Sequence, residues 1–475
     1  MTRARTARGL AVCCLLLQAA CHRTEPAGFL PPDGGLPNVV LITIDTLRAD
    51  HLGCYGTRFG DLTPNLDRFA AGACVFLAAT TPAPATLPAL ASLHTGLYPG
   101  RQPIRTNIGA LPTNVPVLAE ILQQHGYTTA AFFGNSLLVP KSGFRRGFEQ
   151  YRSFVARPPA ASDASGADMA LEWLGSAPRA PWFLWVHFMD PHGPYDSAPV
   201  AWSTGLEPPD PLPNRDLPVS ATNYGLGMIP QYQVLAGVTQ ASAYRMRYRG
   251  EVRFSDAALG RVLAALDAPA TRNRTVVVIA ADHGESLGEH DYYFQHGWFP
   301  YEDCVHVPLL LRVPGGGARR VSQPVSLVDI LPTVLAGLRF PALPGLEGRD
   351  LGPLLRGGEL DDAAVFSVTA YLNQMTAIRR GHWKLVYTPP PPAPFAGDPW
   401  AGDYSPHEER ALYDLGADPG ETKNLYATDR ARADQLWAAL ASWQGTHDIP
   451  IGRRTFPTPD EATRQRLEAL GYGAP

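Results

Sequence analysis

Continuous apolar runs recur along the chain and predict strands that are buried on both faces. The first run is NVVLITI (Asn38–Ile44), and later runs are WFLWVHF at 182–188, TVVVIA at 275–280 and VPLLLRV at 307–313. These runs lack the apolar–polar alternation that marks a strand with one solvated face. The sheet they build is therefore expected to be covered on both sides.

Helical patterns at 116–125, 168–174 and 232–266 separate these apolar runs. Strands that alternate with helices are typical of α/β proteins with a mostly parallel central sheet. The segment 197–230 is rich in proline and has no periodicity. We expect it to form a long surface loop, and it is a candidate lid over the site.

The pattern changes after about residue 358. AVFSVTAY (364–371) and HWKLVYT (382–388) predict short strands, and a helical pattern runs from about 429 to 444. These elements indicate a smaller α+β subdomain packed on the main domain. The predicted organisation is a leader at 1–21, a linker at 22–37, a main domain at 38–358, the C-terminal subdomain at 359–450 and a tail at 451–475.

The first 21 residues have the pattern of an export signal. Three arginines precede the apolar run Leu10–Leu17, and small residues follow it. The run is too short to span a bilayer. The letters LQAAC resemble a bacterial lipobox with Cys21 as the lipid-carrying residue, although Gln18 stands where such boxes carry an aliphatic side chain. We expect an exported protein of the periplasm or cell envelope, with membrane attachment through a lipid on Cys21 as an open alternative.

Composition narrows the class of protein further. Hydrophobic residues make up 45% and charged residues 18%, which is ordinary for a globular protein. The net charge of −4 gives no basic surface for nucleic acid. Cys54, Cys74 and Cys304 follow the leader and have no metal-binding spacing. We interpret them as small buried apolar residues, and one disulfide among them stays open.

Polar residues follow three of the predicted strands. Asp45 ends the first, MDPHGPY follows the second, and Asp282, His283 and Gly284 follow the third. Ligands of open parallel sheets bind beyond the carboxyl ends of the strands, so these residues are expected to converge. Ordinary turn chemistry is the alternative for each strand taken alone.

Carboxylates and an imidazole at one edge predict a divalent cation, with Asp45, Asp282 and His283 as ligands. Gly284 would allow the bend that lets two adjacent residues face one ion. Thr86 would be the fourth ligand, and a bound cation would make its hydroxyl a competent nucleophile. Thr86 could instead be a plain helix N-cap. Ca²⁺, Mn²⁺ and Zn²⁺ are all compatible with this set, and the imidazole favours a transition metal.

Six stretches together resemble one known family. They are VVLITIDTLRADHLGCYG, TLPALASLHTGLYP, VHFMDPHGPY, ADHGESLGEH, YEDCVHVPLLLRVPG and ALYDLGADPGETKNL. Their order and spacing resemble the sulfatase branch of the alkaline phosphatase superfamily over nearly all of the chain after the leader. The resemblance implies an alkaline phosphatase-like fold and metal-dependent hydrolysis of sulfate or phosphate esters through a covalent intermediate.

The resemblance also implies roles for single residues. The family's metal ligands fall on Asp45, Asp282 and His283, and its nucleophile falls on Thr86. His192 matches a histidine that contacts the transferred group or the leaving group, and here it is the candidate proton donor.

Other residues match the family less directly. Asn107 stands where several members place a substrate-binding amide. His296 lies near the position of a lysine and is expected to bind the anion or donate a proton. His187 and Asp190 are weaker candidates, because a histidine inside a buried strand is more often a core residue. Glu285 is expected to support the site.

Two departures from the family pattern bear on the reaction. Typical sulfatases carry C/S-x-P-x-R and oxidise its first residue to formylglycine, whereas this chain has Thr86 and Leu90 at those positions. Thr46 replaces a second aspartate. Unmodified threonine nucleophiles resemble those of phosphoethanolamine and phosphoglycerol transferases and of nucleotide phosphodiesterases. A transferase, a phosphodiesterase at the envelope and an inactive binding protein are therefore the alternatives to a hydrolase.

Overall fold

The computed structural model describes most of the chain after the leader. The described residues are 29–155, 163–206, 211–223, 225–370, 374–389, 409–447 and 460–469. The predicted export signal and Cys21 lie outside them, as does most of the proline run. No described helix is both long and apolar enough to cross a membrane.

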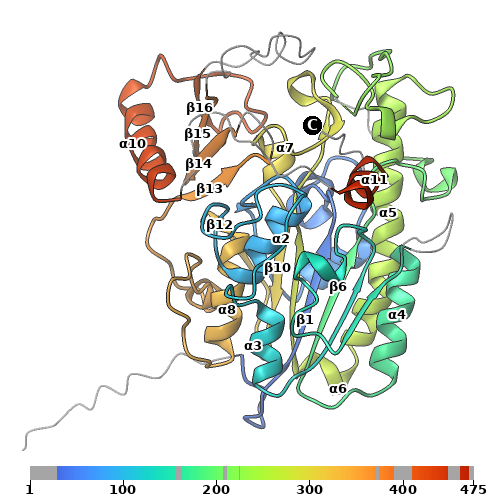
Figure 1. The fold of residues 1–475 in the computed structure, drawn as a ribbon, viewed down its shortest axis with the longest axis vertical. Helices are drawn as coiled ribbons and strands as arrows, with labels where there is room; N and C mark the ends of the chain where they lie inside the picture. The colour runs from blue at the N-terminus through green and yellow to red at the C-terminus, as the bar shows by residue number, and fades with distance from the viewer. Residues whose placement is uncertain are drawn as a thin grey trace, which may run out of the picture.

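A mixed sheet runs through the middle of the molecule (Figure 1). Its central strand β1 (Asn38–Ile44) pairs in parallel with β6 (Trp182–Phe188) and β7 (Thr275–Ala281), and all residues of these three strands are buried. The described strands lie in the order β11 (Arg319–Val321), β2 (Cys74–Phe76), β10 (Leu309–Arg312), β7, β1, β6, β4 (Thr128–Phe133) and β5 (Gln150–Ser153). The predicted α/β class and mostly parallel sheet are confirmed.

Two features of the sheet differ from the sequence pattern. The run at 307–313 forms only the short strand β10, which is antiparallel to both β7 and β2. Strands β4 and β5 escaped prediction because TTAAFF is short and rich in alanine, and QYRS is mostly polar. Their pairing with β6 and with each other, rather than their own pattern, makes them strands.

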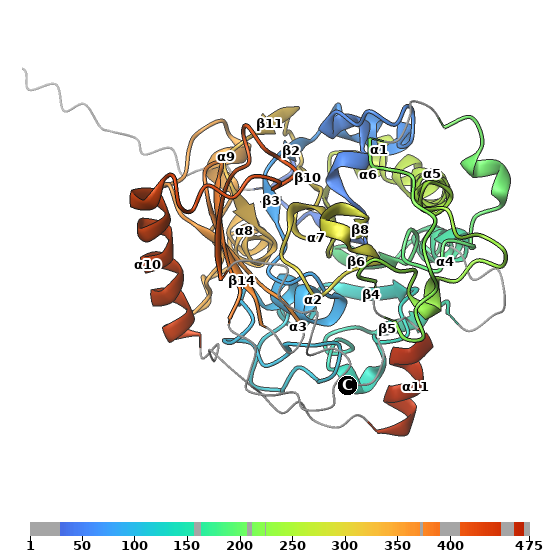
Figure 2. The same cartoon turned by 90° about the horizontal axis from the view of Figure 1, so that it is seen from above.

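Helices cover both faces of the sheet (Figure 2). One face carries α1 (Pro64–Ala70), α4 (Asp163–Gly175), α5 (Ala241–Leu266) and α6 (Pro269–Arg272), and the other carries α2 (Thr86–Thr95), α3 (Leu118–Gln124) and α8 (Ile330–Gly337). Shorter helices are α7 (Glu302–Val305) and α9 (Gly352–Leu355). Helix α5 starts at Ala241 rather than at 232, because a separate 3-10 turn at Gln231–Gln233 follows Pro230.

The predicted surface loop at 197–230 is anchored beside the site. It lies against a hairpin of β8 (Ser286–Leu287) and β9 (Tyr293–Gln295). The backbone N–H of Tyr293 donates to the Gly225 carbonyl at 2.8 Å, and Gln295 Nε2 donates to the Asn223 carbonyl at 2.6 Å. The loop therefore reaches the strand that precedes His296, and its action as a lid stays a prediction.

The C-terminal subdomain is an antiparallel sheet with one long helix. Its strands are β13 (Val365–Val368), β14 (Thr376–Arg380), β15 (Trp383–Tyr387) and β16 (Arg410–Asp414), and its helix is α10 (Arg430–Thr446). The Val368 N–H donates to the Pro82 carbonyl at 2.9 Å, and the Ala370 N–H donates to the Gly297 carbonyl at 3.1 Å. The subdomain therefore supports the segments that lead to Thr86 and away from His296.

The ends of the described chain are held against the main domain. Phe29, within the predicted linker, is buried, and its N–H donates to the Gly337 carbonyl at 2.7 Å. The last helix, α11 (Glu461–Ala469), lies in the predicted tail. Just before it, Asp460 forms an ion pair of 2.9 Å with Lys141. A two-stranded sheet of β3 (Ala79–Thr80) and β12 (Val325–Ser326) completes the described elements.

The three cysteines after the leader are all free thiols. Cys74 and Cys304 are buried as expected, and Cys54 is half-buried. The structure has no disulfide among these three residues, so the pairing that the sequence left open does not form. Burial raises the pKa of the Cys54 thiol to about 12 and of the Cys74 thiol to about 11. Little of the reactive thiolate therefore forms near neutral pH.

Candidate active site

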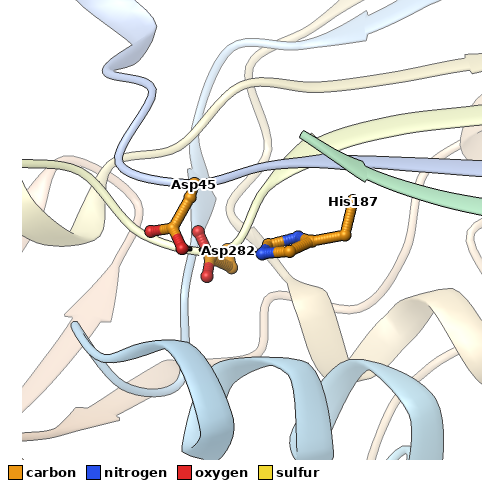
Figure 3. A group of neighbouring side chains, drawn as sticks. All are labelled: Asp45, His187 and Asp282. Carbon is orange, nitrogen blue, oxygen red and sulfur yellow. Dashed lines mark ion pairs between the residues drawn. The ribbon is translucent and has the colours of Figure 1, made fainter. Parts of the chain in front are cut away.

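The carboxyl ends of three neighbouring strands place acidic and imidazole side chains at one point (Figure 3). Asp45 directly follows β1, Asp282 directly follows β7, and His187 is the second-last residue of β6. The register brings the last residue of β1, Ile44, opposite both Phe188 and Ala281. This register is what carries residues from distant parts of the chain to the same edge.

The predicted metal ligands and nucleophile do converge. His283 Nε2 lies 3.5 Å from Asp45 Oδ1, 3.7 Å from Asp282 Oδ2 and 3.4 Å from Thr86 Oγ1. All four residues are fully buried. His283 Nδ1 lies 2.9 Å from the Gly284 carbonyl, which can only accept a hydrogen bond. Nδ1 therefore carries the proton, and the Nε2 lone pair faces the other three residues.

A second group of three side chains shares Asp45 and Asp282. One ligand atom of each of these residues and one ring nitrogen of His187 all lie within 4.8 Å of one another, so the three could hold a metal ion. His187 Nε2 lies 3.5 Å from Asp45 Oδ2. The sequence favoured a core role for His187. The structure instead places it, fully buried, beside a candidate metal ligand.

The electrostatics of this edge suit a cation. Burial and the negative charge of Asp45 raise the pKa of the Asp282 carboxyl well above its usual value. Burial also opposes ionisation of Asp45, but the neighbouring histidines, led by His192, lower its pKa overall. Burial lowers the pKa of His283 to about 3, so its imidazole is neutral.

The donor set passes a direct test of fit to a metal ion. Asp45 Oδ1 and Asp282 Oδ2 are buried oxygens without a hydrogen-bond donor. Such atoms are rare in folded proteins because each costs desolvation energy. Two carboxylates and a neutral imidazole that face one point form a donor set that divalent cations accept. A bound ion would supply the missing partner of both oxygens.

Thr86 is the first residue of helix α2. The structure makes Ala85 rather than Thr86 the N-cap of this helix, and the Thr86 hydroxyl lies 3.4 Å from His283 Nε2. Asn107 Oδ1 accepts a hydrogen bond of 2.9 Å from the Leu87 N–H, while Asn107 Nδ2 is buried with no hydrogen-bond partner. The Asn107 Nδ2 group therefore stays available for a further hydrogen bond, and its role in binding substrate stays a prediction. Leu90 is packed in the hydrophobic core.

His192 and His296 lie on the same side of the site. Their ring centroids are 5.2 Å apart, and the His296 ring is 4.3 Å from that of His283. His192 Nδ1 donates to the Gly193 carbonyl at 2.7 Å, so Nε2 is the ring atom that can face a leaving group. His296 Nδ1 lies 3.1 Å from Glu285 Oε1. Burial lowers the pKa of His296 to about 3 and raises that of Glu285 to about 8.

Sequence reasoning missed Asn135 and gave Asp190 only as a weaker candidate. Asn135 follows strand β4, and its Nδ2 donates to Asp45 Oδ2 at 2.8 Å. The Leu137 N–H donates to Asn135 Oδ1 at 2.9 Å and so fixes the orientation of the amide. The signal would have been a polar residue after a strand, but β4 itself was not predicted. Asp190 lies away from this edge and contacts the backbone of Asp163.

Thr46, which stands in place of the family's second aspartate, has an unusual backbone. Its φ is 54°, in the left-handed region that β-branched residues rarely adopt. The Tyr248 hydroxyl donates to the Thr46 carbonyl at 2.7 Å, and the Asp282 N–H donates to the Ile44 carbonyl at 3.4 Å. The strained turn therefore links the ends of β1 and β7.

The chain matches the Sulfatase family over residues 37–338, a span that contains every site residue described above. The chain belongs to the sulfatase family. It is accordingly an enzyme of the sulfuric ester hydrolase class, with the alkaline phosphatase-like fold that the resemblance implied.

Curated relatives align over most of their length. The steryl-sulfatase of Mus musculus is 27% identical, with 93% of this chain and 86% of that protein aligned. The choline-sulfatase of Rhizobium meliloti is 25% identical, with 93% and 92% aligned. The family assignment therefore extends to the C-terminal subdomain as well as the main domain.

Solved structures share the fold at lower identity. A 2-O glycosaminoglycan sulfatase superposes with a TM-score of 0.68 at 22% identity, covering 87% of this chain and 93% of that one. The phosphonate monoester hydrolase of Agrobacterium radiobacter superposes with a TM-score of 0.67 at 24% identity, covering 86% and 96%. The same fold therefore carries enzymes that are named for sulfur and for phosphorus esters.

Proposed function

We propose that this sulfatase-family hydrolase cleaves sulfate or phosphate esters with Thr86 as an unmodified nucleophile and a divalent cation as cofactor. The observation that carries the proposal is the convergence of Thr86 Oγ1, Asp45, Asp282 and His283 at one buried point. The two unpartnered carboxylate oxygens of this group support the cation. The neutral imidazole favours Mn²⁺ or Zn²⁺ over Ca²⁺.

Each residue of the site has a separate role in forming the covalent intermediate. A divalent cation held by Asp45, Asp282 and His283 would lower the pKa of the Thr86 hydroxyl and offset charge on the ester oxygens. The Thr86 hydroxyl releases its proton to solvent, Oγ1 attacks the sulfur or phosphorus atom, and the bond from that atom to the leaving oxygen breaks. Protonated His192 gives its proton to the leaving oxygen.

The resulting threonyl ester must then be released. Water gives a proton to the now neutral His192 and attacks the same sulfur or phosphorus atom. The bond to Thr86 Oγ1 breaks, and Thr86 takes up a proton from solvent, which restores its hydroxyl. Asn107 Nδ2 and His296 are placed to bind the non-bridging oxygens and to stabilise the developing charge. If an acceptor alcohol replaces water, the same steps make the enzyme a transferase.

Thr86 favours phosphorus over sulfur as the reacting atom. Oxidation of threonine would give a ketone rather than the aldehyde of formylglycine, and Leu90 occupies the position of the arginine that accompanies formylglycine. A phosphonate monoester hydrolase among the solved neighbours supports phosphoryl chemistry on this fold. The sulfatase names among the relatives support sulfate esters, so both classes belong in the test.

Turnover of matched substrates tests the proposal. Purified protein lacking the leader would be assayed on an aryl sulfate, an aryl phosphate monoester, an aryl phosphate diester and an aryl phosphonate monoester. Each assay would be run with Ca²⁺, Mn²⁺ and Zn²⁺ in turn, beside Thr86→Ala and Thr86→Ser. We expect metal-dependent turnover that Thr86→Ala abolishes and Thr86→Ser partly retains.

The outcomes separate the alternatives. Full activity of Thr86→Ala would overturn the assignment of the nucleophile. Silence on every substrate and metal would favour the inactive binding protein. Transfer of the group to an added alcohol in preference to water would identify a transferase.

A further inference from the structure

A row of buried polar side chains leads from the core to Asp45. Thr43 and His187 are register partners in the parallel pair β1–β6, and Trp185 lies two residues before His187 in β6. Trp185 Nε1 lies 2.9 Å from Thr43 Oγ1, and Thr43 Oγ1 lies 2.8 Å from His187 Nδ1. His187 Nε2 then lies 3.5 Å from Asp45 Oδ2. All four side chains are fully buried.

The donor and acceptor roles fix which atom of each side chain in this row carries the hydrogen. An indole N–H can only donate, so Thr43 Oγ1 accepts the hydrogen bond from Trp185. The hydroxyl hydrogen of Thr43 needs an acceptor of its own, and His187 Nδ1 at 2.8 Å supplies it. A neutral imidazole that accepts at Nδ1 carries its proton on Nε2. His187 Nε2 has no hydrogen-bond partner in the structure, and Asp45 Oδ2, 3.5 Å away, is the carboxylate oxygen beside it.

Asp45 then has two different oxygens. Oδ2 receives the Asn135 amide at 2.8 Å and faces the Nε2–H of His187. Oδ1 has no hydrogen-bond partner and lies 3.5 Å from His283 Nε2, on the side of Thr86. When hydrogen-bond donors hold Oδ2 of a carboxylate, its Oδ1 is presented to a metal ion in one orientation.

We propose that His187 is a positioning residue for Asp45 and does not bind the metal ion itself. It donates from Nε2 to Asp45 Oδ2, together with Asn135, and this fixes Oδ1 toward the ion. The inference rests on the proposed function, because it presumes a divalent cation at Asp45, Asp282 and His283. It goes further by predicting that the ion has one imidazole ligand, although the distances alone would allow two.

The competing arrangement has a physical defect. If His187 bound the ion through a lone pair on Nε2, its proton would move to Nδ1. Thr43 Oγ1 would then face two donors, the Trp185 indole and the His187 Nδ1–H, and its own hydroxyl hydrogen would have no acceptor. A buried donor without an acceptor is strongly disfavoured.

Metal binding, measured without any turnover, tests the inference. The protein would be stripped with a chelator and reloaded with Co²⁺, and affinity would be measured by calorimetry. X-ray absorption would count the imidazoles on the ion. We expect His187→Leu and Thr43→Val to weaken binding by about 10–100-fold, the range seen when groups that orient metal ligands are lost.

His187→Gln and His94→Gln sharpen the test. The glutamine amide at position 187 can still donate to Asp45, so we expect it to recover part of the affinity with an unchanged imidazole count. His94 is another fully buried histidine, 4.4 Å from the Trp185 ring, and no hydrogen bond joins it to Asp45. His94→Gln controls for general damage to the core, and thermal unfolding of the metal-free proteins shows that each variant folds.

The results separate failure of the inference from failure of the proposed function. Two imidazoles in the wild-type spectrum, with one lost in His187→Gln, would make His187 a ligand and overturn the inference alone. Equal Co²⁺ affinity in the wild type, His187→Leu and Thr43→Val would reduce His187 to a core residue. A folded wild type that binds no divalent cation would overturn the proposed function, and the inference with it.

Discussion

Two buried ionic clusters among the described residues differ in how their charges are matched. At the sheet edge, Asp45 and Asp282 face each other with oxygens that have no donor. Between the main domain and the C-terminal subdomain, Lys384 Nζ lies 2.9 Å from both Glu302 Oε1 and Glu421 Oε1. Arg379 lies 2.9 Å from the second oxygen of Glu302.

The pKa shifts show the difference at Glu302. Although burial opposes ionisation, Lys384 and Arg379 lower the pKa of Glu302 to about 2, while burial raises the pKa of Glu421 to about 7 despite Lys384. At the sheet edge, burial and Asp45 raise the pKa of Asp282 instead. A cluster that balances its own charges holds two parts of the fold together. A cluster with excess negative charge needs a bound cation to balance it. This imbalance marks the cluster at the sheet edge as the functional site.

The largest expected effect comes from Asp282→Asn. Turnover should fall about 10³-fold or more, because several kcal/mol of charge stabilisation would be lost with the cation. The metal-free variant should nevertheless unfold at a higher temperature than the metal-free wild type, because the repulsion with Asp45 is gone. Steady-state kinetics and thermal unfolding in chelator check the two parts. If metal-free Asp282→Asn were less stable than the metal-free wild type, the contrast between the two clusters would be contradicted.

Lys384→Met should behave in the opposite way. Removing the lysine leaves Glu421 buried without a cation, and we expect a loss of about 3–5 kcal/mol in the free energy of unfolding. Activity of the folded fraction should change little. Arg380→Gln is the matched control, because its ion pair with Asp362 is exposed and should contribute less than about 1 kcal/mol. Denaturant unfolding measures both, and equal losses would remove the distinction between the clusters.

Glu251 provides a third case, a buried acid without a cation. Burial and the nearby Asp190 raise the pKa of Glu251 from 4.5 to about 9. The folded state therefore favours the protonated acid. Its stabilising effect is complete below the unfolded pKa and is lost as the pH rises toward 9. We expect the unfolding free energy to fall by at most about 1.4 kcal/mol per pH unit from this group.

Glu251→Gln should make that pH dependence shallower between pH 5 and about 9. Denaturant unfolding at several pH values measures the slope. A variant with the same slope as the wild type would show that another group controls stability in this range.

The smallest expected effect concerns strain at the functional edge. Thr46→Gly removes a β-branched side chain from a left-handed backbone position. The stability gained by relieving this strain exceeds the stability lost through the greater conformational entropy of glycine in the unfolded chain. We expect the metal-free protein to be stabilised by about 1 kcal/mol. Denaturant unfolding checks this, and a destabilised variant would mean that the Thr46 side chain contributes packing that outweighs the strain.

The sequence predicts those features that a local pattern encodes. The strands β1, β6 and β7 appear as apolar runs because both of their faces are buried, and Asp45, Asp282 and His283 stand out because they interrupt such runs. The helix that begins at Thr86 is also predicted, because a hydroxyl residue is typical of a helix start. The resemblance to the sulfatase family supplied the roles of Asn107, His192 and His296, which no local pattern distinguishes.

Other features depend on pairing and were beyond the sequence. Strand β4 has a weak pattern of its own, so Asn135 at its end could not be assigned to the site. His187 looked like a core residue because the sequence does not reveal that Thr43 lies opposite it in the register. The antiparallel direction of β10 and the free cysteines likewise follow from tertiary contacts.

The central claim is that Thr86 attacks the ester and carries the transferred group. The most direct measurement is to quench the enzyme with acid during turnover of its best aryl ester and to map the modified peptide by mass spectrometry. The account predicts one phosphoryl or sulfuryl group on Thr86 of the wild type and none on Thr86→Ala. A group on another residue, or turnover that continues in Thr86→Ala, would contradict it.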